Sequence, residues 1–435
     1  MASNLIRNAF DQYQHCENRL THAFVHAVAH DEGLAREFVR FATGAGPPAG
    51  CHLSVSCQVA PGSSPELLTL ERKPDDPSVP DAWIFDERLS WALVCECKVT
   101  ADLRAEQLRR HVQAAHRRGF DEVTLLVITA HEEQPSSVRT IANGGQGLRV
   151  CWRSWAQVHS FFSRHGLNPF VVQFVDYVRV LEGYLMANGY DGPPLTAFEG
   201  IQFGQTSPYS EGAAKVVLRA LMKELRPRLE AILPVDTGIR RAALSGTWDV
   251  IGFQTSSPGE SFTQHPHLTV WISREEACVQ VTLPNNARRE YWARLQGCSK
   301  DEIQEALATV VQGSKPIRRL VGRGIWEPRL FWSTGQVHFY ARHSEISDGN
   351  ISFDLESVLP PTTPQTSGVK VVPAWLDATL ALLKQKNRAN FELSLQARFP
   401  LLEGSVSREH GFVDALVRSV DAFRPFINLL FGPHF

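Results

Sequence analysis

Two apolar runs separated by a short polar segment stand out in Pro80–Lys98, PDAWIFDERLSWALVCECK. Asp81–Asp86 and Trp91–Val99 are rich in aromatic and aliphatic residues, a composition that favours β-strands. The intervening Glu87–Ser90 is polar and is typical of a hairpin turn. The pattern therefore predicts a β-hairpin whose two strands are largely buried.

The register of this hairpin decides which charged side chains meet. With the turn centred between Arg88 and Leu89, Asp81 lies directly opposite Glu96, and opposed residues share a face with Cβ atoms about 5 Å apart. Lys98 shares that face because side chains alternate along a strand. Two carboxylates this close repel unless one takes up a proton or a cation lies between them. Mg²⁺ can be bound by such a pair of carboxylates. The simpler interpretation is that Glu96 and Lys98 are solvated on an exposed face, which is less expected at the end of an apolar strand.

Pro80-Asp81 followed by Glu96-Cys97-Lys98 resembles the motif of the PD-(D/E)XK nuclease superfamily. The resemblance implies that Asp81 and Glu96 are metal ligands, for Mg²⁺ or Mn²⁺, and that Lys98 is the catalytic lysine. A divalent ion lowers the pKa of its bound water and stabilises charge on a phosphoryl group under attack. The lysine would then orient that water or offset charge on the phosphate.

The elements around the hairpin follow the order of that nuclease fold. After the hairpin, the pattern predicts a helix, a buried strand, a short strand and a second helix, over 100–118, 122–129, 148–152 and 154–162. Thr100 or Asp102 is expected to cap the first helix, and Ser154 the second. Before the hairpin, the pattern predicts helices over 2–41 and strands over 52–59 and 66–71. The expected fold is an α/β nuclease core, a mixed β-sheet flanked by helices, over about residues 1–165.

Two further residues are candidates for the site by the same resemblance. Gln107 matches a glutamine that lines the site in many family members, and it shares a helix face with His111 four residues on. Glu17, on the first helix, is similar to the additional acid that many members carry near the metal. The alternatives are a solvated glutamine and a solvated glutamate paired with Arg7 or Arg19.

The helix after the hairpin is the densest basic segment near the motif. Fixed cations close to a nucleic acid attract its phosphates. The nucleic-acid-binding candidates on this helix are Arg104, Arg109, Arg110, Arg117 and Arg118. A solvated arginine face with no ligand is an equally simple alternative.

Length, net charge and cysteine spacing limit the number of domains and the kinds of site that the chain can carry. The chain has 435 residues, a formal net charge of −2 and eight cysteines. This length suits two or three domains, and the near-zero charge means that any nucleic-acid surface is local. The cysteines are scattered without zinc spacing, which predicts free thiols in a reducing cytoplasm. No signal segment is evident, and the most apolar run, Pro169–Met186, is interrupted by charged residues, which predicts a packed helix and no membrane span.

The remaining chain changes character at about residue 234. Residues 166–233 are predicted to be a helical connector, which packs on the first domain or mediates self-association. Residues 234–435 predict an α+β domain with a role in targeting, sensing or assembly. Its strands are expected over 244–255, 267–273, 277–283, 329–332, 336–343 and 351–355, and its helices over 285–295, 301–312, 373–386, 390–398 and 410–430.

Two features of this second part invite a functional interpretation. Lys315–Arg329 combines glycines, arginines and Trp326, which suits phosphate contact and base stacking. A solvated loop is the simpler interpretation of that segment. His265 and His267 have no acidic or cysteine partner near them in the sequence, so they are expected to be structural.

These features predict a metal-dependent nuclease that hydrolyses phosphodiester bonds, with DNA as the expected polymer and RNA as an alternative. The main rival is a non-catalytic nucleic-acid-binding or assembly module on the same scaffold. The second domain would select a target or bind a partner protein, and a homodimer would supply two sites for cutting both strands. A cytoplasmic effector of bacterial anti-phage defence is suggested by analogy alone.

Overall fold

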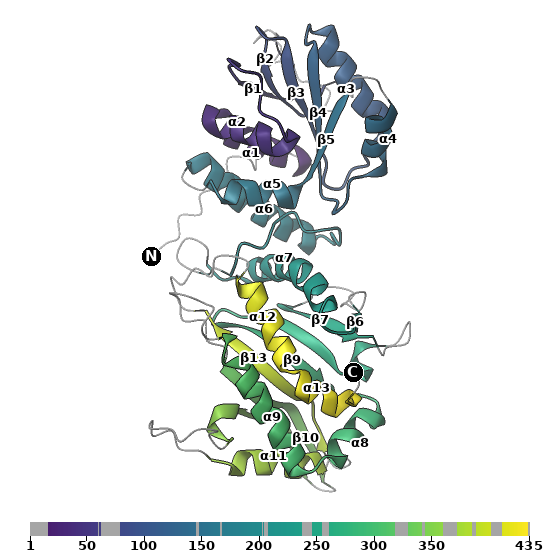
Figure 1. Cartoon of the computed structure of the whole chain (residues 1–435), viewed down its shortest axis with the longest axis vertical. Coiled ribbons are helices and arrows are strands. Elements are labelled where there is room, and N and C mark those ends of the chain that lie inside the picture. The colour runs from purple at the N-terminus through teal and green to yellow at the C-terminus, as the bar shows by residue number, and fades with distance from the viewer. Residues whose placement is uncertain are drawn as a thin grey trace. The chain divides into compact units, whose positions relative to one another are not determined.

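The chain forms two compact units, Met1–Ala197 and Phe198–Phe435 (Figure 1). The computed structural model describes residues 16–59, 61, 79–144, 148–165, 168–201, 203, 208–236, 246–254, 261–317, 329–341, 344–359, 372–384, 389–401 and 411–433. The strand predicted over 66–71 and most of the segment 315–329 lie outside these residues. Each unit combines helices with a β-sheet of its own, which agrees with the expected α/β core and a second α+β part.

The described part of the first unit is built on a five-stranded sheet in the order β1-β2-β3-β4-β5. The strands are β1 (Ser54–Cys57), β2 (Ala82–Asp86), β3 (Trp91–Cys97), β4 (Glu122–Thr129) and β5 (Arg149–Ser154). The first three are antiparallel neighbours, and the last three run parallel. The sheet is therefore mixed, as predicted, and β3 is the central strand at which its antiparallel and parallel halves meet.

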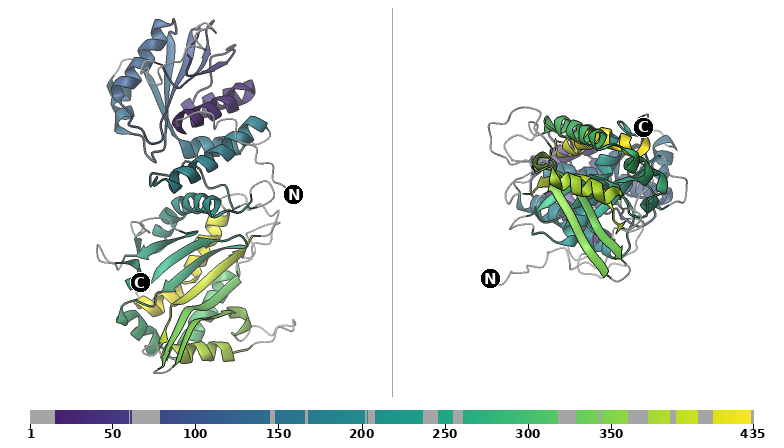
Figure 2. Two further views of the ribbon diagram at one scale, coloured as in Figure 1. Left: turned by 180° about the vertical axis from the view of Figure 1, so that it is seen from behind. Right: turned by 90° about the horizontal axis from the view of Figure 1, so that it is seen from below.

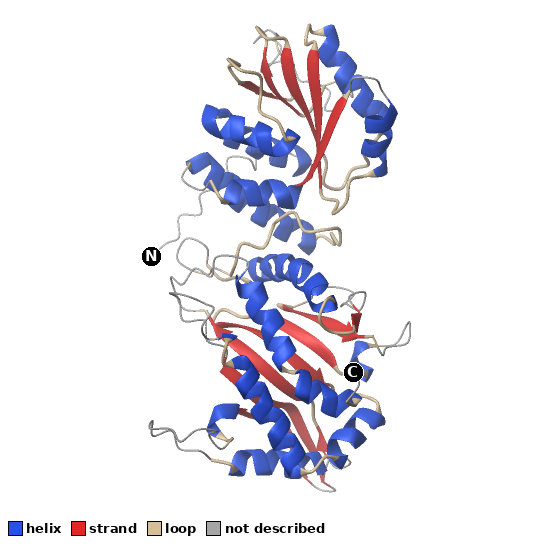
Figure 3. Ribbon diagram, in the orientation of Figure 1, coloured by secondary structure: helices blue, strands red, loops and turns tan. Residues whose placement is uncertain are grey.

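Helices cover both faces of this sheet (Figures 1 and 3). One face packs against α1 (Cys16–Ala29), α2 (Glu32–Thr43) and α5 (Trp155–Ser163), and α6 (Pro169–Ala187) packs in turn on α1 and α5. The other face packs against α3 (Ala105–Arg117) and α4 (Ser136–Gly144). A strand covered on both faces needs apolar residues at successive positions, and β3 is accordingly buried along its whole length.

Helix α5 begins where the sequence predicts. The Ser154 hydroxyl accepts a hydrogen bond from the backbone N–H of Gln157 at 3.2 Å. The side chain of Gln157 in turn accepts one from the Ser154 N–H at 3.0 Å. This reciprocal capping box satisfies two of the donors that the first turn of a helix leaves free, and the predicted cap is confirmed.

The stretch 166–233, predicted to be a connector, is divided between the two units. Helix α6 buries Phe174 and Val178 in the core of the first unit. Helix α7 (Glu211–Glu230) buries Leu218 and Leu221 in the core of the second. Helix α6 packs its apolar face on helices α1 and α5, whereas α7 packs on the sheet of the second unit.

The second unit carries an antiparallel sheet whose described strands follow the order β11-β10-β13-β9-β8-β7-β6, with β12 beside β10. The strands are β6 (Val235–Asp236), β7 (Trp248–Phe253), β8 (His267–Ile272), β9 (Glu276–Leu283), β10 (Arg329–Ala341), β11 (Ser344–Asp354), β12 (Ala389–Asn390) and β13 (Leu393–Pro400). One face packs against α7, α8 (Arg289–Gly297), α9 (Lys300–Ser314), α11 (Ala374–Lys384), α12 (Gly411–Ala422) and α13 (Arg424–Phe431). Viewed from behind, the strands lie in front of the yellow helix α12 (Figure 2, left).

Strand β13 corrects the sequence prediction. The sequence predicts a helix over 390–398, and this is wrong, because residues 393–400 form a strand between β9 and β10. Leu393, Leu395, Ala397 and Phe399 all point into the core, which is the two-residue period of a strand. Flanking strands on both sides supply backbone partners for this segment, and that tertiary context overrides its local helical preference.

Candidate active site

The β2–β3 hairpin has the register that the sequence predicts. Ala82 pairs with Cys95 and Asp86 pairs with Trp91. One step beyond the first of these pairs, Asp81 comes opposite Glu96. The turn is fixed by the Asp86 carboxylate, which accepts hydrogen bonds from backbone N–H groups within the turn. Glu96 consequently lies on the face of the sheet that α3 covers, at the open end of the hairpin.

Asp81, Glu96 and Lys98 converge at this end of the hairpin. The Lys98 Nζ lies 2.7 Å from Oε1 of Glu96 and 4.0 Å from Oδ2 of Asp81. Oδ2 of Asp81 also accepts a hydrogen bond from the backbone N–H of Cys97, at 2.7 Å. Glu96 is 1% exposed, whereas Lys98 and Asp81 are 15% and 18% exposed. Solvent or a ligand therefore reaches Lys98 and Asp81 first, and Glu96 lies behind them.

Helix α3 adds two polar side chains to this cluster. Gln107 donates from Nε2 to Oε1 of Glu96 at 2.6 Å, which places it where the resemblance implies. Nε2 of His111, one turn further along, lies 2.9 Å from the other carboxylate oxygen, Oε2. The sequence analysis noted that these two residues share a helix face but did not assign His111 to the site. The signal that identifies it is its four-residue spacing from Gln107, which aims both at the same carboxylate.

The electrostatics of the three charged groups differ although they are close together. Burial raises the pKa of Asp81 to about 8, and the nearby Glu96 charge adds to this effect. Burial also acts to raise the pKa of Glu96, but the His111 hydrogen bond and the Lys98 charge outweigh it, so this pKa is lowered. For Lys98 the two carboxylates outweigh burial and raise the pKa. Glu96 and Lys98 thus form an ion pair, and Asp81 is left short of positive charge.

The Glu17 side chain forms hydrogen bonds with the backbone that follows Lys98. Its Oε1 accepts hydrogen bonds from the backbone N–H groups of Val99, Thr100 and Ala101, at 2.8, 2.9 and 3.0 Å. These residues are thereby held in a turn, so α3 begins only at residue 105. The cap expected at Thr100 or Asp102 is wrong for this reason. The carboxylate, assigned by resemblance to the metal, makes these contacts with the backbone.

The five candidate arginines of α3 are in different environments. The side chain of Arg109 lies 3.6 Å from Glu106, and Arg118 donates to the Pro61 carbonyl at 2.7 Å. Arg104 and Arg117 are exposed, and Arg110 is half-buried. Nε of Arg110 is buried without a hydrogen-bond partner in the described part of the chain. Arg109, Arg110 and Arg117 lie on α3 while Arg104 and Arg118 flank it, and their contact with a nucleic acid stays a prediction.

The donor set of the cluster suits a hard divalent cation. Asp81 and Glu96 offer carboxylate oxygens, the ligands that Mg²⁺ and Mn²⁺ prefer. The pKa of Asp81 is raised by burial and by the Glu96 charge, and a bound cation would favour its ionised form. The fit has one condition, because both Glu96 oxygens are already bound by Lys98, Gln107 and His111. Within the described residues, no group of three or more His, Cys, Asp and Glu side chains is arranged to hold a metal ion. A cation would therefore need Lys98 to turn away from Glu96.

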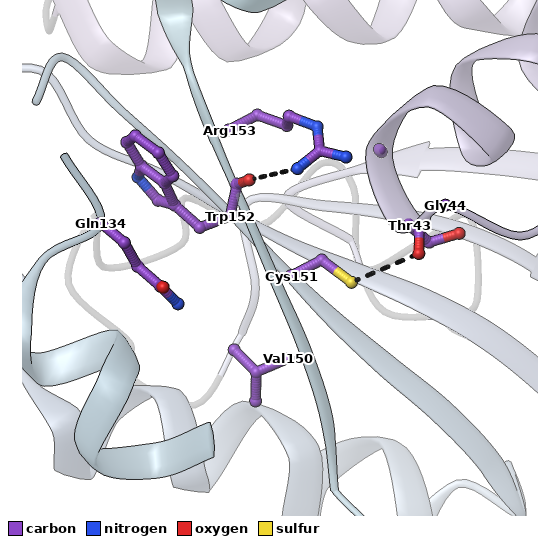
Figure 4. Close-up of a pocket in the computed structure, with 8 residues that line it drawn as sticks. Thr43, Gly44, Gln134, Val150, Cys151, Trp152 and Arg153 are labelled. Carbon is purple, nitrogen blue, oxygen red and sulfur yellow. Dashed lines mark hydrogen bonds between the residues drawn. The ribbon is translucent and has the colours of Figure 1, made fainter. Parts of the chain in front are cut away.

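A pocket of about 340 Å³ lies elsewhere in the first unit, between the end of α2 and strand β5 (Figure 4). Arg153 lines it, but its guanidinium already donates to the carbonyls of Phe41 and Trp152. Cys151 approaches the carbonyl of Thr43, and burial raises the pKa of its thiol. The cation of this pocket is thus engaged with the backbone, and the acidic cluster at the hairpin is the better candidate for chemistry.

Comparison with known proteins found no match for this chain. No protein-family model matches the chain, and no curated protein or solved structure matches it either. In the described residues no helix is long and apolar enough to span a membrane. The seven cysteines whose side chains are described are free thiols, as expected. The candidate function therefore rests on the residues of the hairpin and of α3.

Proposed function

We propose that the first unit is a metal-dependent nuclease with its active site at Asp81, Glu96 and Lys98. The observation that carries this proposal is the convergence of two carboxylates and one lysine at the end of a buried hairpin. The pKa of Asp81, raised to about 8 by burial and by Glu96, supports it. Perturbed carboxylates that are partly open to solvent are more typical of functional sites than of surface ion pairs.

In this proposal, Asp81 and Glu96 would hold Mg²⁺ or Mn²⁺. The ion would supply an activated water and would neutralise charge on the phosphodiester. Lys98, which is more exposed than Glu96, would position the attacking water or stabilise the phosphate oxygens. Gln107 would keep Glu96 oriented through its hydrogen bond to Oε1, and Glu17 would fix the backbone beside the lysine.

A second candidate function is a nucleic-acid-binding or assembly module that retains this cluster as structure only. One observation favours it, because Lys98 and Gln107 bind one Glu96 oxygen and His111 lies close to the other without a metal. A buried ion pair with further hydrogen bonds can be a stable arrangement in itself. The two candidates differ in whether Asp81 is needed for binding of a divalent cation.

Cleavage is the direct test. Purified full-length protein is incubated with plasmid DNA and, separately, with RNA, in Mg²⁺ or Mn²⁺, with EDTA as a control. Lys98→Ala and Asp81→Asn are compared with two matched control variants, Lys384→Ala and Asp121→Asn. Both control residues are exposed. Metal-dependent cleavage that the site variants abolish and the control variants retain is the expected result, and the substrate that is cut names the polymer.

A direct titration of Mn²⁺ separates the two candidate functions when no cleavage is seen. Calorimetry of the wild type and of Asp81→Asn measures whether the cluster binds the ion. Binding that depends on Asp81 supports a nuclease that awaits its substrate or signal. If wild type and variant give the same result, the cluster is a structural ion-pair network and the nuclease proposal fails.

A further inference from the structure

The sheet of the second unit has two unlike faces, one under the helices and one that carries polar and aromatic side chains. On the second face, Arg329, Arg398, Trp271 and Trp248 lie in one row across β10, β13, β8 and β7, with Cys278 of β9 in the middle. Directly opposed residues of antiparallel strands share a face. The two guanidinium groups are therefore neighbours, and so are the two indoles. We call these four residues the Arg–Trp row.

Trp271 is held in place by a chain of hydrogen bonds along the same face. Its indole Nε1 donates to Oε1 of Gln280 at 3.3 Å. The amide of Gln280 donates to the Thr282 hydroxyl at 3.0 Å, which in turn lies 3.0 Å from the hydroxyl of Thr269. Gln280 is 8% exposed. A buried amide whose acceptor and donor are both used in this way fixes the orientation of the ring above it.

A matching chain on β13 holds Arg398. Its Nε donates to Oε1 of Gln396 at 2.7 Å, and the amide of Gln396 donates to the Ser394 hydroxyl, also at 2.7 Å. The guanidinium lies over the ring of Phe331, 4.3 Å from its centroid. Its Nη1 is 3.5 Å from the Glu276 carboxylate. Gln280 on β9 and Gln396 on the neighbouring strand β13 thus make the same kind of contact, each accepting a hydrogen bond from a side chain of the row.

The row itself remains accessible while the glutamines are buried. Both tryptophans and Arg398 are half-buried, and Arg329 is exposed. No ion pair of Arg329 is present within the described residues. The adjoining β8–β9 turn adds Arg274, Glu275 and Glu276. With Arg329 and Arg398 of the row, this gives three arginines and two glutamates, and therefore a small net positive charge. The row thus combines fixed aromatic rings with a modest cationic charge.

We propose that the Arg–Trp row binds a single-stranded nucleic acid, with bases stacked on Trp248 and Trp271 and phosphates bound by Arg329 and Arg398. Aromatic platforms beside cations are the combination that single strands require. Neighbouring strands are about 4.8 Å apart, so the cation pair and the indole pair are separated by about 10 Å. Adjoining nucleotides of one strand can span this distance.

A duplex fits the row less well than a single strand. Paired bases hide their faces, and duplex binding depends on many phosphate contacts, whereas this row offers two guanidinium groups. The inference stands apart from the chemistry at Asp81, Glu96 and Lys98, because binding by the second unit requires no cleavage.

Fluorescence anisotropy of labelled oligonucleotides tests this proposal. The full-length protein is titrated in EDTA into oligothymidylate and, separately, oligouridylate of about 12 nucleotides, which is within the site size of comparable surfaces. We expect binding with quenching of tryptophan fluorescence, weakened about five- to a hundredfold by Trp271→Ala, the usual effect of removing one stacked ring. Trp271→Phe should restore part of it. Arg329→Ala should reduce the salt dependence by about one counterion.

Two control variants remove the same residue types from the helical layer. Trp375→Ala on α11 and Arg289→Ala on α8 delete exposed side chains and should bind as the wild type does. Circular dichroism shows whether each variant is folded. Absence of binding by the wild type, or equal losses in row and control variants, overturns the proposal. So does displacement of the oligonucleotide by polyglutamate at equal charge, since the row would then be a simple anion site.

Because EDTA prevents any metal-dependent cleavage, the titration measures binding whether or not the protein is a nuclease. Lys98→Ala should bind the oligonucleotides as the wild type does. The two proposals therefore fail separately: loss of binding in Trp271→Ala does not depend on cleavage, and loss of cleavage in Lys98→Ala does not depend on the row. The thymidylate and uridylate arms distinguish DNA from RNA as the source of the strand.

Discussion

Nε2 of His111 lies 2.9 Å from Oε2 of Glu96, and both side chains are almost entirely closed off from solvent. Within the described residues neither ring nitrogen makes a well-aligned hydrogen bond, so the approach to Glu96 is a close polar contact. The histidine is thus dedicated to one carboxylate. Together with Gln107, which holds the other oxygen, it makes α3 the element that orients the Glu96 carboxylate.

Replacing His111 should cost more stability than its size suggests. His111→Ala leaves a buried carboxylate oxygen without a partner, and such a loss costs about 3 kcal/mol of unfolding free energy. Gln113→Ala, at an exposed position of the same helix, should change it by less than about 0.5 kcal/mol. Guanidinium unfolding of both variants measures the difference. A loss equal to that of Gln113→Ala would show that the 2.9 Å contact does not contribute to stability.

Lys98 should compete with a divalent cation for Glu96. Its ammonium already lies 2.7 Å from Oε1, so a variant without the charge leaves this oxygen open. Lys98→Met keeps most of the apolar stem without the ammonium. We expect this variant to bind Mn²⁺ at least as tightly as the wild type, by calorimetry, while cleavage is lost. Weaker Mn²⁺ binding by Lys98→Met would mean that the lysine helps to form the cation site.

The raised pKa of Asp81 predicts how the metal-free protein responds to pH. In the unfolded chain this group loses its proton near its ordinary value of 3.8, whereas in the folded chain it keeps the proton until about pH 8. Between these values the folded state binds more protons than the unfolded one, so this group's stabilising contribution is lost as the pH rises through about 8. Asp81→Asn, which mimics the protonated acid, should remove this loss.

Urea unfolding in EDTA across this pH range measures the effect. The free energy of unfolding of the wild type should fall relative to that of Asp81→Asn on going from about pH 6 to about pH 9. Added Mg²⁺ should stabilise the wild type most at the higher pH, because a metal ion competes with the proton for the carboxylate. Parallel pH profiles for wild type and variant would contradict the raised pKa.

Glu17 offers a way to separate an anchoring role from metal binding. Glu17→Ala removes three hydrogen bonds to the turn after Lys98 and should lower the unfolding free energy by about 2 kcal/mol. Glu17→Gln keeps an acceptor oxygen, so most of that stability should remain. If Glu17→Gln remains stable but binds Mn²⁺ more weakly than the wild type, the carboxylate contributes to the cation site. Equal Mn²⁺ binding assigns it to the backbone alone.

The site could be predicted from the sequence as far as local rules determine it. Strand alternation and a short polar turn were enough to place Asp81 opposite Glu96, and the observed pairing of Ala82 with Cys95 has that register. Gln107 was assigned to the site by the resemblance to the nuclease family, and helical spacing showed only that it shares a face with His111. That shared face is the sequence signal for His111, but its 2.9 Å contact with Glu96 also depends on how closely α3 packs on β3, which is a tertiary distance.

The second unit holds one prediction that a local rule could have corrected and one feature that no local rule reaches. Phe391, Leu393, Leu395 and Ala397 alternate with polar residues, which is the two-residue period of a strand, so the helix predicted over 390–398 rested on the wrong period. The Arg–Trp row has a different origin. Trp271 and Arg398 lie far apart in the chain, and only the order of the strands brings them to one face. No spacing rule within a single segment reveals such a row.

The strand order also bears on how the chain is made. In the first unit β2 and β3 meet across a short turn, and all the described strands of the sheet have been synthesised by residue 154. In the second unit β9 must wait for β13, which follows about 110 residues later. N-terminal units generally fold first during synthesis, and an unpaired strand edge invites association with other chains. Truncations that end before residue 390 should therefore aggregate through β9, although their first units are complete.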